Sequence, residues 1–236
     1  MSWWQRLLGR APELDAGLRE RLTTCSKFPE PDLSRSFRQT RFVVVDVETT
    51  GLNPHRDRLI SIGAVPVEAN LVRLEDGFEV ILRQPRPSAN DNILVHGIDG
   101  TTQTSGRDPA EALVEFMEYA RKDVLVGFHA GFDQVVIARA MKSVLRIAPT
   151  NQWLDLAILT PEILPHASPG ESTLDGWTEQ LGIDNPARHN AVADALVTAQ
   201  LLLVTLGAAQ QRGITRPADL VAIERAGRWL DTGRSR

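Results

Sequence analysis

The segment Phe42–Glu48, Phe-Val-Val-Val-Asp-Val-Glu, restricts the fold of this chain more than any other feature. Its apolar start predicts a buried strand. Side chains alternate between the two faces along a strand, so Asp46 and Glu48 share one face while the intervening valines point to the other. Two adjacent carboxylates repel each other at neutral pH. A strand end that carries such a pair is typical of a site that shares a cation.

Length and charge restrict the class of protein. The 236 residues suffice for one large domain, alone or with an extension. Hydrophobic residues make up 42% and charged residues 24%, which is typical of a soluble globular protein. The formal net charge of −4 provides no global positive field. This disfavours a protein that grips long DNA through many phosphates, but not an enzyme that holds a strand end through metal ions.

Cysteine usage and apolar segments bear on location. The single cysteine, Cys25, allows neither a disulfide framework nor a cysteine zinc site within the chain, and a cytoplasmic location is predicted. The apolar run near Met1 is too short for a signal peptide. We expect no membrane association, because no stretch approaches the roughly 18 apolar residues of a span.

The hydrophobic pattern divides the chain into three predicted parts. Residues 1–40 form an N-terminal helical extension and linker, residues 41–210 the main domain, and residues 211–236 a C-terminal helix that packs on the domain. Four large side chains at helical spacing in the first part either pack back on the domain or bind a protein partner: Trp3, Trp4, Leu7 and Leu8.

Periodicity and turn residues locate the elements. Strands are predicted over residues 42–47, 58–68, 78–83, 124–128 and 153–156. Helices are predicted over residues 109–121, 132–145, 172–182, 190–206 and 217–230, and residues 94–98 are interpreted as a loop. Strands first and βα units later predict an α/β fold, a mixed five-stranded sheet flanked by helices.

Two later segments place acidic residues at element boundaries. Asp133 falls in the first turn of a helix, where the helix dipole favours a carboxylate by about 0.3–1 kcal/mol. Asp194 projects from an early turn of another helix. His189 would lie about 140° from Asp194 around a helix, so we place it in the preceding loop. Taken alone, each residue also fits a plain role as a helix-start acid, a solvated aspartate or a surface histidine.

Together these residues form a set with a definite chemistry: Asp46, Glu48, Asp133, Asp194 and His189. Carboxylate oxygens suit Mg²⁺ or Mn²⁺. Two such ions about 3.5–4 Å apart clamp the attacking and leaving oxygens in phosphodiester cleavage. A histidine titrates close enough to neutrality to take a proton from the attacking water. The set is sufficient to hydrolyse a phosphodiester bond without a covalent intermediate.

The residues resemble the motifs of the DEDDh 3′–5′ exonucleases, most closely the exonuclease domain of the proofreading epsilon subunit of DNA polymerase III. Asp46–Gly51 matches the first motif, Phe132-Asp133 the second and His189–Asp194 the third, in the family's order and spacing. The resemblance covers residues 41–206. It implies a ribonuclease H-like fold, two Mg²⁺ or Mn²⁺ ions, and release of nucleoside 5′-monophosphates from a 3′ end.

The resemblance also implies individual roles. It makes Asp46, Glu48, Asp133 and Asp194 metal ligands and His189 the general base. It implies that six further residues contact the substrate: Thr49, Thr50, Gly51, Leu52, His96 and His129. Family members usually have asparagine at position 129, and histidine there can still donate a hydrogen bond. Asp155 is interpreted as structural.

The sequence is compatible with three functions. The first is a metal-dependent 3′–5′ exonuclease acting on single-stranded DNA ends, in proofreading or repair. The second is RNA trimming, as in ribonuclease T or oligoribonuclease. The third is a nucleic-acid-binding or partner-docking module without catalysis, which has no need of all five groups. Arg139, Lys142 and Arg146, at i, i+3 and i+7 of one helix, are either phosphate contacts or a solvated face.

Overall fold

A mixed β-sheet lies at the centre of the protein, with β1 in its middle. The computed structural model describes residues 14–167, 169–170, 172–184 and 190–234. The predicted segment of Trp3, Trp4, Leu7 and Leu8, and His189, lie outside these residues. Within them the strands are β1 (Phe42–Thr49), β2 (Leu59–Glu68), β3 (Leu71–Val72), β4 (Phe78–Ile81), β5 (Val124–Gly127) and β6 (Trp153–Asp155).

Strand pairing gives the sheet its mixed character. β2 pairs antiparallel with β1, and both β3 and β4 pair antiparallel with β2. On the other side β5 runs parallel to β1, and β6 runs parallel to β5. The predicted α/β fold is confirmed, and the sheet has one strand more than the five predicted. The additional strand, β3, has only two residues, which is too short for hydrophobic alternation to reveal.

Helices cover both faces of the sheet. Their bounds are α2 (Ala16–Ser26), α3 (Asn90–His96), α4 (Gly100–Ser105), α5 (Pro109–Ala120), α6 (Gly131–Val144), α7 (Leu156–Ile163), α8 (Leu174–Leu181), α9 (Ala191–Gln211) and α10 (Pro217–Arg234), with 3₁₀ turns at Phe37–Gln39 and Leu74–Asp76. The loop predicted over residues 94–98 is wrong in its first half, because α3 continues to His96. Helices as short as α3 and α4 show too little periodicity to be recognised in the sequence.

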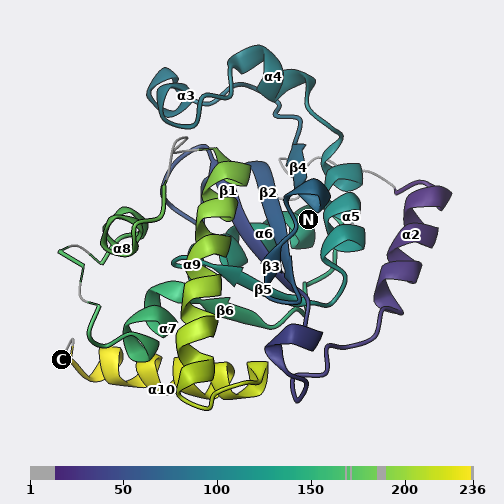
Figure 1. Cartoon of the computed structure of the whole chain (residues 1–236). Helices are drawn as coiled ribbons and strands as arrows, with labels where there is room; N and C mark the ends of the chain where they lie inside the picture. The colour runs from purple at the N-terminus through teal and green to yellow at the C-terminus, as the bar shows by residue number, and fades with distance from the viewer. Residues whose placement is uncertain (1–13, 168, 171, 185–189, 235–236) are drawn as a thin grey trace.

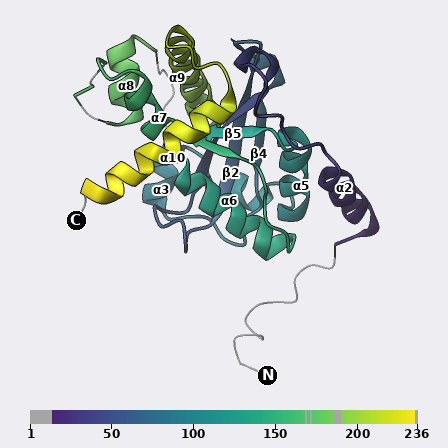
Figure 2. The ribbon, with the colours of Figure 1, turned by 90° about the horizontal axis from the view of Figure 1, so that it is seen from below.

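The sheet separates two helical layers (Figures 1 and 2). α5 and α6 cover one face and α9 crosses the other, beside α7 and α8. The core divides in the same way: Val43 and Val45 belong to the cluster with α5 and α6, while Phe42 and Val44 belong to the cluster with α9. The alternation inferred for β1 is thus confirmed, and Asp46 lies on the α9 face.

Polar caps fix where several helices begin, among them α8 and α9, which carry residues of the site. Asp108 accepts a hydrogen bond from the Ala110 N–H at 3.0 Å, with Pro109 at the first helical position. The side chains of Thr173 and Asn190 cap α8 and α9 in the same way. Asn190 is therefore the residue that sets the start of α9 and the position of Asp194 in its first turn.

The helix α9 is long and apolar enough to cross a membrane, by length and composition alone. The expectation that no stretch approaches this limit was therefore wrong. In the structure α9 packs along β1 and β2, and its buried residues belong to the domain core. Its apolar composition is accounted for by this core position, and such a helix is weak evidence for a span.

Candidate active site

The carboxyl end of β1 and the start of α9 bring three predicted residues together. Carboxylate oxygens of Asp46, Glu48 and Asp194 all lie within 4.8 Å of one another. Asp194 is only 4% exposed, whereas Asp46 and Glu48 are half-buried. The pairing of β1 with β2 shifts register between Glu48 and Thr49. A bulge of this kind bends a strand and re-aims its side chains.

A glycine allows α9 to reach these carboxylates. Gly63 of β2 pairs with Asp46 in the sheet register. A Cβ atom at Gly63 would lie 2.2 Å from the backbone carbon of Ala191 and 2.3 Å from the backbone nitrogen of Val192. The start of α9 therefore rests on bare strand backbone. The sequence carries a signal for this contact, because an isolated glycine within a strand often marks a close approach of another backbone.

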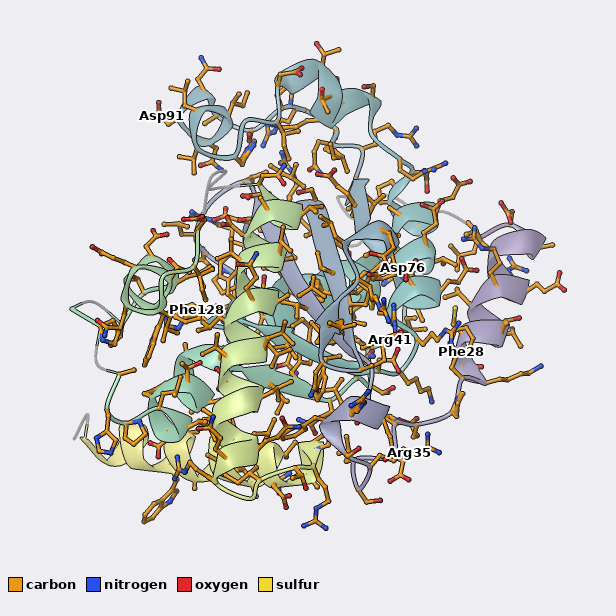
Figure 3. All side chains as sticks on the ribbon, in the orientation of Figure 1. Phe28, Arg35, Arg41, Asp76, Asp91 and Phe128 are labelled. Atoms are coloured by element: carbon orange, nitrogen blue, oxygen red, sulfur yellow. The ribbon has the colours of Figure 1, made fainter. Side chains whose placement is uncertain are left out.

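A cavity of about 300 Å³ opens onto the carboxylates. Its described lining contains Asp46, Glu48 and Asp194, with Phe128 and His129 at the end of β5 and Thr173 and Leu174 at the start of α8. Figure 3 shows Phe128 between α9 and α8. His129 is exposed and adopts φ 57°, a left-handed conformation uncommon for a non-glycine residue. Phe128, Thr173 and Leu174 were not predicted, because nothing in their local sequence distinguishes them.

Asp133 lies beside the three carboxylates rather than among them. It is 5% exposed, in the first turn of α6 as predicted. Burial raises the pKa of Asp133 to about 8, and the charges of Asp155 and Glu48 act in the same direction. A nearby cation favours the ionised form of such a group. The position of Asp133 next to Glu48 thus suits a ligand of a bound metal.

The donor set fits divalent metal ions. The described lining of the cavity offers carboxylates from two elements and contains neither lysine nor arginine. Hard oxygen donors at this density are the environment that Mg²⁺ and Mn²⁺ prefer. Asp46, Glu48 and Asp194 would hold such ions, with Asp133 beside them. His189 lies outside the described residues, and its role as general base stays a prediction.

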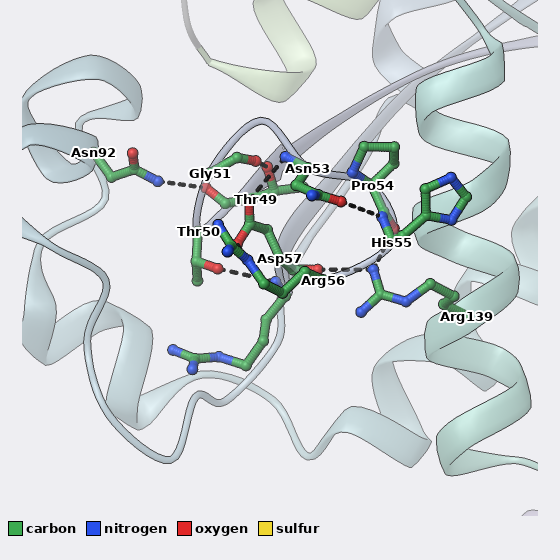
Figure 4. Close-up of polar contacts among 11 residues, drawn as sticks. Thr49, Thr50, Gly51, Asn53, Pro54, His55, Arg56, Asp57, Asn92 and Arg139 are labelled. Atoms are coloured by element: carbon green, nitrogen blue, oxygen red, sulfur yellow. Dashed lines mark hydrogen bonds and ion pairs between the residues drawn. The ribbon is translucent and has the colours of Figure 1, made fainter.

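The segment after Glu48 forms a tightly bonded loop (Figure 4). The Thr50 hydroxyl accepts the Arg58 N–H at 2.9 Å, and the Asp57 carboxylate accepts the Asn53 N–H at 2.8 Å. A Cβ atom at Gly51 would lie 2.5 Å from that carboxylate, so only glycine fits there without movement. At the tip Leu52 is 92% exposed. The predicted substrate segment is therefore a rigid loop that presents one apolar side chain.

His96 is turned inward. It is 5% exposed, its Nδ1 accepts the Ile98 N–H at 3.0 Å, and its Nε2 lies 3.4 Å from the Ser88 hydroxyl. Burial lowers the pKa of His96, so the neutral ring is favoured in the folded chain. The ring thus fixes the turn after α3. A direct contact with a nucleotide base, implied by the resemblance, would require this turn to open.

We expect His96 to make stability depend on pH. Because its pKa is lowered on folding, the unfolded chain takes up a proton first as pH falls below about 6.5. Stability from the neutral ring is complete above that pH and decreases below it. In His96→Asn, the amide oxygen can replace Nδ1 as acceptor without titrating. Chemical unfolding between about pH 7.5 and 5 should show a steeper loss for the unaltered chain. Parallel curves for the two proteins would contradict this role.

Asp155 caps α7 and links the site to α10. Its carboxylate accepts the Ala157 N–H at 3.1 Å and lies 3.6 Å from the Arg228 guanidinium. Arg228 also donates to Glu224 at 2.6 Å, and burial raises the pKa of Glu224. Among the described residues, Asp155 is absent from the three-carboxylate cluster. These contacts support its interpretation as a structural residue.

Sequence comparison identifies the class of protein. The profile of the RNase_T family, described as Exonuclease, matches residues 43–202. The chain therefore belongs to this exonuclease family, as its three motifs predicted.

Two relatives illustrate the match. The PolC-type DNA polymerase III of Thermotoga petrophila is 29% identical over 185 residues, which are 78% of this chain and 13% of that protein. The DNA polymerase III subunit epsilon-like protein of Rhodobacter capsulatus is 33% identical over 193 residues, which are 80% of this chain and 27% of that protein. The chain thus spans well under half the length of either relative.

Solved structures share the fold. Exonuclease I of E. coli in complex with a dA16 oligonucleotide matches with a TM-score of 0.64 at 18% identity, covering 73% of this chain and 42% of that chain. The complex with a dT13 oligonucleotide matches with a TM-score of 0.61. These similarities confirm the predicted ribonuclease H-like exonuclease fold.

Proposed function

We propose that this chain is a metal-dependent 3′–5′ exonuclease that hydrolyses single-stranded DNA ends and releases nucleoside 5′-monophosphates. The observation that carries the proposal is the cluster of Asp46, Glu48 and Asp194 within 4.8 Å, at the mouth of a cavity and beside buried Asp133. A binding module would gain nothing from concentrating these negative charges where phosphates must approach.

Each part of the site has a distinct task in hydrolysis. When bound, two divalent ions supply a reactive water at neutral pH and neutralise charge on the scissile phosphate. The carboxylates of Asp46, Glu48, Asp133 and Asp194, which β1, α6 and α9 position, would hold these ions. His189, one residue before the cap of α9, takes the proton of the attacking water. His129 at the cavity rim donates a hydrogen bond to the substrate.

The rim of the site suits the end of a strand with unpaired bases. Asn92 of α3 donates to the Thr49 carbonyl at 3.0 Å, which joins α3 to the loop that carries Leu52. Leu94 and Val95 of α3 are 83% and 54% exposed. Exposed apolar side chains on joined segments offer a surface for bases, whose faces stack without regard to sequence. Exonuclease I, which shares the fold, binds dA16 and dT13 in its solved complexes, and both of these oligonucleotides are DNA. This supports DNA rather than RNA as the substrate of the present chain.

A matched substrate panel tests the proposal. DNA and RNA oligonucleotides of one sequence, labelled at the 5′ end, are incubated with the protein and Mg²⁺ and resolved by length. We expect a ladder that shortens stepwise from the 3′ end of DNA, and none when a chelator removes the metal. Faster shortening of RNA would instead identify an RNA-trimming enzyme. Absence of product with Mg²⁺ and with Mn²⁺, although the strand binds, would refute catalysis.

A further inference from the structure

A second cavity, of about 460 Å³, lies on the α6 side of the sheet and is strongly basic. Its lining includes the ends of β2 and β4, Pro109 of α5 and several residues of α6. Five lining side chains are basic and one is acidic: Arg58, Arg83, Arg139, Lys142 and Arg146, against Asp57. In a chain of net charge −4, this is a marked local concentration of positive charge.

The basic cavity adjoins the carboxylate site through two shared elements. The loop that presents Leu52 to solvent continues to Asp57 and Arg58, which line the basic cavity. Arg139 donates to the carbonyl of Pro54 and to that of Asp57, the latter at 3.0 Å (Figure 4). The same α6 carries Asp133 in its first turn, and Arg139 follows about 9 Å further along the helix axis.

Several of these cations already have partners that hold the fold. The Arg58 guanidinium donates to the Gln84 amide oxygen and to the Arg86 carbonyl, both at 3.0 Å. Burial, with the charge of Arg86, lowers the pKa of Arg58, and the carboxylate of Asp57 acts in the opposite direction. Arg83 is paired with Asp108 at 2.6 Å. Among the described residues, the carboxylates of Asp108 and Asp57 offset part of the positive charge of this group.

The two remaining cations are available to a ligand. Lys142 and Arg146 are exposed, and neither forms an ion pair in the part of the chain that the structure describes. Lys142 follows Arg139 at i+3 on α6, and Arg146 lies just beyond the end of that helix at φ 61°; all three line the cavity. These cations follow Asp133 one after another along the chain. Such an arrangement suits a ligand that carries negative charges at intervals along its length.

We propose that the basic cavity binds the phosphate backbone of the substrate strand, at nucleotides that precede the 3′ end. The proposal rests on the function proposed above, and extends it by assigning a path for the strand around the loop of residues 50–58. The two cavities share no lining residue, so we expect a ligand that occupies both to be longer than a mononucleotide. The basic cavity should therefore raise the rate of hydrolysis of strands relative to that of esters of a single nucleotide.

The test uses two double charge reversals of the full chain with equal net charge. Lys142→Glu with Arg146→Glu alters the cavity, and Lys27→Glu with Arg225→Glu alters exposed positions at the end of α2 and on α10. Binding of oligonucleotides of about 4 and about 16 nucleotides is measured by fluorescence anisotropy with a chelator present. Hydrolysis of the longer strand and of an aryl ester of thymidine 5′-monophosphate is measured with Mg²⁺.

We expect the cavity variant to bind the longer strand about tenfold more weakly at low salt, and the slope of log affinity against log salt to fall in magnitude by about 1.4. Its kcat/KM for the longer strand, relative to the ester, should fall by a similar factor. The control variant should keep the salt slope and the ratio. Equal losses in both variants, or none in either, would overturn the proposal. Failure of the unaltered chain to hydrolyse either substrate would refute the exonuclease, while strand binding would still test the cavity.

Discussion

Asp46→Asn is expected to lower the rate of 3′-end hydrolysis at least about a thousandfold, while the metal-free protein becomes more stable. The substitution keeps the shape of the side chain and removes one of three carboxylates whose oxygens lie within 4.8 Å of one another. Less negative charge means less affinity for divalent ions. It also means less repulsion in the folded chain when no ion is bound. Activity and stability should therefore move in opposite directions.

Two measurements on the same samples separate this outcome from simple misfolding. Thermal unfolding with a chelator should give a higher midpoint for Asp46→Asn than for the unaltered chain. Added Mg²⁺ should raise the midpoint of the unaltered chain much more than that of the variant, because only ions that bind the folded state stabilise it. Asp76→Asn, at the exposed position labelled in Figure 3, should alter neither property. A lower metal-free midpoint for Asp46→Asn would show that Asp46 has a structural role instead.

The carboxylate cluster could be predicted from sequence because each member follows from local geometry. Strand alternation alone places Asp46 and Glu48 on one face, and the start of a helix places Asp194 near its N-terminus. What local geometry cannot supply is the distance between segments. Asp133 was grouped with the other acids, yet it lies outside their 4.8 Å set and is buried beside Glu48. That separation depends on how α6 docks, which involves residues from several elements.

Long-range packing also explains the features that the sequence alone could not show. The family resemblance implied a substrate contact for His96, and in the structure its ring is held by Ile98 and Ser88 within the domain. In the sequence, the spacing of Arg139, Lys142 and Arg146 favoured a solvated face over phosphate contacts. Only the fold shows that Arg58 and Arg83 line the same cavity. Spacing along a helix identifies a face, whereas the tertiary structure determines what that face meets.

Gly63→Ala is expected to impair both catalysis and stability, although residue 63 bears no chemical group. The added methyl would lie 2.2 Å from the backbone of Ala191, where no flexible side chain can yield. The start of α9 must therefore move away from β2, and Asp194 moves with it, away from Asp46 and Glu48. Overpacking of this kind costs about 1–3 kcal/mol of unfolding free energy. A displacement of about 1 Å at the catalytic groups lowers the rate roughly a hundredfold.

The matched control is Gly207→Ala, on the same α9 but with no heavy atom within 4 Å of the added methyl. In a helix interior this exchange stabilises by about 0.5–1 kcal/mol, so its unfolding midpoint should rise and its activity should persist. Combining the two substitutions offers the sharper result. Because the added helix stability does not restore the contact between α9 and β2, the double variant should regain part of the lost stability while its rate stays roughly a hundredfold lower. Recovery of activity with stability would instead show that Gly63 supports the fold alone and does not position Asp194.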